Sequence, residues 1–176
     1  MKCDIKDLVL DKVKEVNEVP SDVLGVSKHL CGAATDLALR SLVTFANSGS
    51  GSRLKAVQIA LCCHHRCDWP LFVGKKFMVE RFKLKDVAEF RMLLAMTSWA
   101  TCGDGRPRST QSKVSLDKKE KREDLGRKAK RILDAARMHF LIEALGPEYE
   151  ASLSEYIDRE TTPENVMLIC HLKPSK

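Results

Sequence analysis

Two short apolar runs with an amphipathic segment between them limit the folds open to this chain. Val23–Ser27 and Lys55–Leu61 are bounded by polar or turn residues and lack helical spacing, so each is predicted to be a buried strand. Between them, Thr35 and Asp36 are typical of a helix cap and a first-turn acid, and apolar residues recur at helical spacing until near Asn47. Strand, helix and strand in this order predict a parallel crossover unit of a doubly wound α/β sheet.

Further elements are predicted on both sides of this unit. The additional strands are Lys2–Ile5 ahead of it and a closing pair, Tyr149–Ile157 and Asn165–Leu172. The additional helices are Phe72–Phe82, Val87–Trp99 and Leu116–Leu145. The last helix has an apolar stripe of Ile132, Leu133, Ala136, Phe140 and Leu141. Residues 103–115 contain Gly, Pro, Arg, Ser and Gln with almost no apolar side chains, which predicts a disordered loop.

Composition narrows the class of protein. A chain of 176 residues has the length of one domain, and 44% hydrophobic with 31% charged residues excludes a wholly disordered chain. No apolar run approaches the roughly 18 residues that a membrane span needs. The net charge of +6 is compatible with a polyanionic partner. The seven cysteines are an odd number, and no signal-peptide pattern follows Met1, so we expect reduced thiols in an intracellular protein, either nuclear or cytoplasmic.

Reactive side chains follow both strands of the crossover unit. Ligands of open parallel sheets bind outside the carboxyl ends of the strands, so the segments that begin at Lys28 and at Cys62 are candidates for a site. The second segment, Cys62–Trp69, holds two His, one Arg, three Cys, one Asp and one Trp in eight positions. Solvated loops rarely concentrate these residue types, so we predict a functional site there.

The same segment raises the question of a metal. Cys62, Cys63 and Cys67 are competent zinc ligands, but neighbouring residues of an extended segment point to opposite sides, and no second Cys or His pair has a finger-like spacing. We therefore expect no metal and interpret Cys62 and Cys63 as small buried apolar residues, although Cys31 could approach through the fold. Cys67 as a nucleophile beside a histidine stays an alternative that requires a lowered thiol pKa.

Three segments resemble a known family. Lys28–Arg40, Ala60–Trp69 and Met96–Ala100 are similar to signature segments of the eukaryotic tRNA 2′-O-methyltransferases that modify the fourth nucleotide of the acceptor stem. The resemblance implies a Rossmann-like class I methyltransferase domain, S-adenosylmethionine as the cofactor, and tRNA as the partner. It implies methyl transfer to a ribose 2′-hydroxyl.

The chain departs from this family pattern at its beginning. Members of the family that this chain resembles are longer proteins. They begin with N-terminal zinc-binding modules, followed by a strand with a Gly-rich loop and a second strand that ends in an acidic residue. No G-x-G-x-x-G occurs in this sequence. The comparison implies that residues 1–176 are the C-terminal portion of one methyltransferase domain, which lacks its first two strands, and that zinc is possible in the preceding modules. The alternative is a truncated, non-catalytic protein that binds tRNA or zinc.

The resemblance also implies roles for individual residues. Asp4 and Ile5 match the segment that meets the cofactor adenine, and Lys28 and His29 follow the strand nearest the transferred methyl, where Lys28 would orient the hydroxyl or His29 accept its proton. Asp36 is expected to offset the helix dipole, with the orientation of Lys28 or His29 as the alternative role. At least one histidine of the pair 64–65 is expected to be structural, and the tryptophans either stack on a flipped nucleotide or belong to the core. The substrate-binding set is His64, His65, Arg66, Asp68, Trp69 and Trp99.

Overall fold

A computed structural model describes residues 4–17, 22–49, 54–84, 86–101 and 116–174. Its centre is a four-stranded mixed sheet in the order β1-β2-β4-β3. The strands are β1 (Val23–Ser27), β2 (Leu54–Ala60), β3 (Tyr149–Glu155) and β4 (Val166–Leu172). β1 runs parallel to β2, and β4 is antiparallel to both β2 and β3. Since α2 (Ala33–Ala46) links β1 to β2, the predicted parallel crossover and closing strand pair are confirmed.

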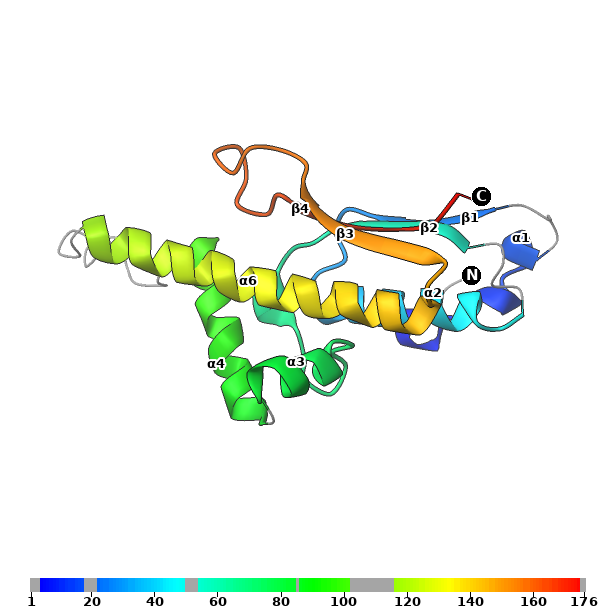
Figure 1. The fold of residues 1–176 in the computed structure, drawn as a ribbon, viewed down its shortest axis with the longest axis horizontal. Coiled ribbons are helices and arrows are strands. Elements are labelled where there is room, and N and C mark those ends of the chain that lie inside the picture. The colour runs from blue at the N-terminus through cyan, green and yellow to red at the C-terminus, as the bar shows by residue number, and fades with distance from the viewer. Residues whose placement is uncertain (1–3, 18–21, 50–53, 85, 102–115, 175–176) are drawn as a thin grey trace.

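The helices form two layers below the sheet in Figure 1. The long helix α6 (Leu116–Leu145) and α2 lie against one face of the sheet, and α3 (Lys75–Phe82) and α4 (Val87–Thr97) lie on the far side of α6 (Figure 1). The short elements are η1 (Ile5–Asp7), η2 (Leu10–Lys12), α1 (Lys14–Asn17), η4 (His64–Arg66) and η5 (Ser98–Ala100). Among the helices of the described ranges, none is both long and apolar enough to cross a membrane.

The core consists of two apolar clusters that share α6. One lies between the sheet and α2 and includes Leu39, Ile59 and Leu141. The other lies between α6 and the helices α3 and α4 and includes Phe90 and Leu133. In the predicted apolar stripe of α6, the side chains of Leu133, Ala136 and Leu141 are fully buried. A single helix therefore ties the sheet layer to the outer helical layer.

Several element boundaries differ from the sequence-based predictions, and two of these differences have a clear local cause. Ile5 lies in the 3₁₀ turn η1 rather than in a strand, because Asp4 Oδ1 accepts a hydrogen bond from the Lys6 amide at 3.0 Å and starts the turn. The first residues of that predicted strand lie outside the described ranges. α2 begins at Ala33, ahead of the predicted Thr35 cap, because Gly32 reverses the chain with φ 55°, and the Thr35 hydroxyl instead donates to the Leu30 carbonyl. The predicted disordered loop 103–115 also lies outside the described ranges.

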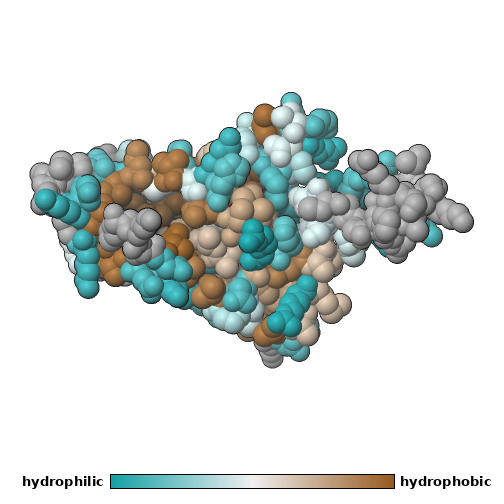
Figure 2. All heavy atoms as spheres, turned by 180° about the vertical axis from the view of Figure 1, so that it is seen from behind, coloured by the Kyte–Doolittle hydropathy of each residue, from teal (hydrophilic) through white to brown (hydrophobic). Residues whose placement is uncertain are grey.

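β1 exposes apolar side chains on the face turned away from α2. Gly25 faces the helix, where an added Cβ would lie 2.8 Å from Leu42 Cδ1. Its neighbours Leu24 and Val26 point the other way and are 63% and 73% exposed. Figure 2 shows brown, apolar surface gathered over the end of the molecule that holds the sheet. Within the described ranges, the second edge of β1 has no partner strand.

This exposed strand is expected to make the 176-residue chain self-associate, since apolar edge strands are templates for pairing. The double variant Leu24→Lys, Val26→Lys should weaken association at least about tenfold, because each buried Leu or Val contributes roughly 1.5–3 kcal/mol. Sedimentation velocity over a concentration series measures this. Met92→Lys, which changes a 69% exposed side chain on α4, is the matched control. A parent chain that stays monomeric throughout the series would contradict the expectation.

Candidate active site

The segments that follow β1 and β2 meet at the carboxyl ends of these strands. The Gly32 amide donates to the Cys62 carbonyl at 3.4 Å, and Cys31 Sγ lies 3.7 Å from Cys62 Sγ. Gly32 has φ 55°, and an added Cβ would lie 2.4 Å from the backbone carbonyl atoms of Arg66, so this close approach requires glycine. The structure thus brings together the two reactive segments that the sequence singled out.

Several predicted site residues are exposed on these two segments. Lys28 and His29 directly follow β1, and both side chains are exposed. His65 and Arg66 lie on η4 and Asp68 follows it, and all three are exposed as well. Two cationic side chains, Lys28 and Arg66, therefore lie on adjoining segments where a polyanion could reach them, together with His29 and His65.

His64 is buried and serves the interior. Its Nε2 lies 2.5 Å from Asp134 Oδ1, and its Nδ1 lies 3.8 Å from Glu164 Oε2. Glu164 in turn receives hydrogen bonds from the Lys130 ammonium at 2.5 Å and from the Cys63 amide at 3.0 Å. His64 is thus the structural histidine that the sequence led us to expect, and it anchors η4 to α6.

A fully buried ion pair between Asp36 and Arg137 contacts the segment that follows β1. Arg137 Nε donates to Asp36 Oδ1 at 3.1 Å and Nη2 to Asp36 Oδ2 at 2.7 Å. Nη2 also contacts the Gly32 carbonyl at 3.0 Å and Cys67 Sγ at 3.1 Å. Burial opposes the charge of Arg137, but the Asp36 carboxylate outweighs it, so the guanidinium pKa is raised. Asp36 therefore does more than offset the helix dipole: it holds a buried cation that orders both segments.

Sequence reasoning missed the three buried polar residues of α6. Lys130, Asp134 and Arg137 are spaced by four and three residues, so they share one face of the helix, and all are buried. This face borders the predicted apolar stripe. Charged residues interleaved with Leu133 and Ala136 were the available signal, because a charge beside a buried stripe must find a buried partner.

The two tryptophans are half-buried and pack against other side chains. Trp69 contacts Phe90 with ring centroids 4.9 Å apart, and Lys75 Nζ lies 5.8 Å from its ring. It borders the cluster between α6 and α4, which favours the core interpretation for this residue. Trp99 lies on η5, with the Arg122 guanidinium carbon 5.8 Å from its ring centroid.

The cofactor candidates Asp4 and Ile5 lie on the N-terminal segment, which packs along α2. Ile5 borders a cavity of about 200 Å³ together with Leu8, Leu37 and other residues of that segment and of α2. Asp4 is exposed and caps η1. The adenine role of this pair stays a prediction.

Three thiols gather where the two segments touch. The Sγ atoms of Cys31, Cys62 and Cys63 all lie within 4.8 Å of one another. Burial, with the hydrogen bond to Cys31 next in importance, raises the pKa of Cys62 to about 12. Cys67 is not part of this group, and burial raises its pKa to about 11. Because burial favours the protonated thiol, this raised pKa is the opposite of the lowered value that the nucleophile alternative for Cys67 requires.

These features define the class of protein. A parallel strand–helix–strand unit that gathers ionisable side chains at the carboxyl ends of its strands is the arrangement of α/β proteins that bind a ligand there. The chain belongs to the methyltransferase TRM13 family, whose model matches residues 1–171.

Several relatives of this family match nearly the whole chain. The tRNA:m(4)X modification enzyme TRM13 of Schizosaccharomyces pombe is 37% identical over 176 residues, which are 97% of this chain and 45% of that protein. The enzyme of the same name from Debaryomyces hansenii is 36% identical over 95% of this chain and 38% of its own length. The human homolog is 35% identical over 58% of this chain. The chain thus spans about two fifths of the yeast relatives' length. No solved structure matches it.

Proposed function

We propose that this chain supplies the reacting half of a tRNA 2′-O-methyltransferase, which transfers a methyl group from S-adenosylmethionine to a ribose hydroxyl of the acceptor stem. The observation that carries the proposal is the junction of the two segments after β1 and β2, with exposed Lys28, His29, His65 and Arg66 on a buried polar scaffold. Membership of the TRM13 family supplies the reaction class.

The chemistry assigns different tasks to these residues. A 2′-hydroxyl is a poor nucleophile, so it must be positioned in line with the sulfonium methyl, and its proton must leave. Lys28 orients the hydroxyl oxygen electrostatically, or His29 accepts the proton. S-adenosylmethionine supplies the electrophilic methyl. Asp4 and Ile5 are the residues of this chain proposed to face its adenine.

The sheet is proposed to be part of a larger Rossmann-like methyltransferase sheet, with residues 1–176 as its C-terminal portion. Parallel sheets normally have both faces covered and continue beyond two strands. The exposed Leu24 and Val26 and the open edge of β1 support a neighbouring strand and covering helices there. The free thiols of the described cysteines fit an intracellular protein, in the nucleus or the cytoplasm.

A chimera tests the proposed function directly. In the Schizosaccharomyces pombe relative, the segment that matches this chain is replaced by residues 1–176. The chimera should transfer a labelled methyl group to tRNA, and the product nucleotide should resist ribose-directed cleavage at one acceptor-stem position. A folded chimera that binds tRNA without any turnover would overturn the proposal in favour of the non-catalytic alternative.

Arg66 is expected to contact an RNA phosphate, because it is exposed on η4 and its planar fork suits a phosphate group. In the chimera, Arg66→Ala should weaken tRNA binding and reduce the slope of log affinity against log salt by about one. The methylation rate at saturating tRNA should change little. Arg91→Ala, at another exposed arginine on α4, is the matched control. An unchanged salt slope would remove Arg66 from the RNA interface.

A further inference from the structure

We propose that Cys31, Cys62 and Cys63 bind one Zn²⁺ ion, which fastens the segment after β1 to the segment after β2. The inference is independent of the proposed methyl transfer, because it rests on the three sulfur atoms alone. It departs from the sequence-based expectation of no metal. In the folded chain Cys31, and not Cys67, lies beside Cys62 and Cys63. Cys67 contacts Arg137 instead.

The spacing of the sulfur atoms matches thiolate coordination. A tetrahedral zinc site with Zn–S bonds of about 2.3 Å places neighbouring sulfur atoms about 3.8 Å apart. Cys31 Sγ and Cys62 Sγ are 3.7 Å apart, and all three sulfurs lie within 4.8 Å of one another. A disulfide would need about 2.05 Å, so the pair is not a bonded cystine. Three soft sulfur ligands select a thiophilic ion such as zinc.

The backbone is arranged to deliver these ligands from two segments. Cys62 and Cys63 are adjacent, and adjacent side chains of an extended segment diverge. Cys63 adopts φ 51° and ψ 44°, the left-handed region that a residue with a Cβ rarely occupies. This turn allows both sulfurs to join Cys31 on one side. The Cys63 amide is held by Glu164, and Gly32 beside Cys31 approaches the backbone of Arg66.

The ligand set leaves one coordination position for an exchangeable group. Among the described residues, no ligand atom of a further His, Cys, Asp or Glu is part of this cluster of three cysteines. Three protein ligands with an open fourth position are typical of zinc sites that bind water or a substrate oxygen. Cys31 and Cys63 are partly exposed residues, so an ion can enter. Each thiol that coordinates releases its proton.

Metal content of the purified 176-residue chain tests the proposal. Expression with zinc in the medium should give about one zinc per chain by inductively coupled plasma mass spectrometry, falling below about a tenth in Cys31→Ser, Cys62→Ser or Cys63→Ser. Cys170→Ala, which removes a buried thiol from β4, should keep its zinc and is the matched control. A parent chain without zinc, or one that carries a Cys31–Cys62 disulfide with two hydrogens fewer, would overturn the proposal.

A measurement on the parent chain separates zinc loss from misfolding of a variant. Bound zinc should protect Cys31, Cys62 and Cys63 from alkylation by iodoacetamide, and a chelator should remove this protection while the circular dichroism stays that of the folded chain. Peptide mass spectrometry reads the three sites individually. Equal alkylation with and without the chelator would show that these thiols hold no metal.

Discussion

Replacing Arg137 by leucine should lower the free energy of unfolding by about 3–5 kcal/mol, because it leaves the Asp36 carboxylate buried without its partner. Asp36→Leu should cost a similar amount by stranding the guanidinium. The double variant Asp36→Leu, Arg137→Leu should recover much of the loss, since a buried ion pair and an apolar pair of similar volume are often close in stability. Urea denaturation of the four chains gives the coupling energy.

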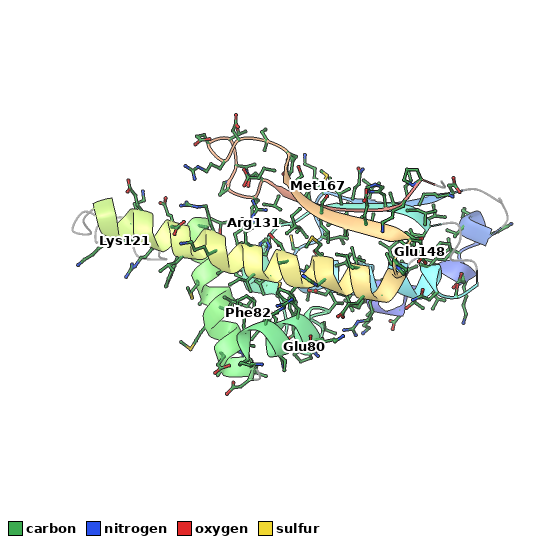
Figure 3. The ribbon with its side chains drawn as sticks, in the orientation of Figure 1. Glu80, Phe82, Lys121, Arg131, Glu148 and Met167 are labelled. Atoms are coloured by element: carbon green, nitrogen blue, oxygen red, sulfur yellow. The ribbon has the colours of Figure 1, made fainter. Side chains whose placement is uncertain are left out.

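A surface ion pair on the same helix provides the control. Arg131 Nη2 lies 2.6 Å from a carboxylate oxygen of Glu155, nearly the distance of the buried pair, but the two side chains are 41% and 60% exposed. Figure 3 shows Arg131 about midway along α6. Arg131→Leu should change stability by less than roughly 1 kcal/mol, because solvent screens exposed pairs. Equal losses from Arg131→Leu and Arg137→Leu would contradict the scaffold role of the buried pair.

Lys28→Ala or His29→Ala, introduced into the chimera, should lower the methylation rate by at least about a hundredfold, the usual contribution of a group that assists proton transfer. The affinity for S-adenosylmethionine should stay nearly unchanged, because neither residue is assigned to the cofactor. Single-turnover assays at saturating tRNA isolate the chemical step.

Controls of the same residue types come from one exposed and one half-buried position elsewhere. Lys76, paired with Glu143, and His171, paired with Glu150, lie on α3 and β4. Lys76→Ala and His171→Ala should leave the rate unchanged. If Lys28→Ala and His29→Ala both retain near-normal rates, the catalytic assignment moves to the segment His64–Asp68.

Local patterns predicted most elements because each pattern carries its own physical signal. The bounds of β1 and α6 agree with the predictions, and β2 is displaced by one residue. Alternation and apolar runs identify strands, and Gly146-Pro147 stops a helix whatever lies around it. Ile5 was misassigned because a short apolar run does not distinguish a strand from a turn that a side chain caps.

The pairing of the buried polar residues could not be predicted, because the partners are far apart in the sequence. Asp36 and Arg137 are separated by 101 residues, and His64 and Asp134 by 70. No spacing rule joins such positions, and buried charges are rare enough that a surface role is the ordinary expectation. The cluster of Cys31, Cys62 and Cys63 could not be predicted for the same reason, because Cys31 comes close to Cys62 only through the crossover. The sequence singled out the two segments, but the tertiary fold decides which of their side chains face inward.

The strand order β1-β2-β4-β3 fixes when the sheet can be completed during synthesis. β4, the last described strand to leave the ribosome, is an inner strand, and β3 reaches the rest of the sheet only through it. Until residues 166–172 emerge, the edge of β2 stays unpaired and β3 has no strand to join. A premature stop codon shortly before β4 would therefore remove that strand and also leave β3 without a partner in the sheet.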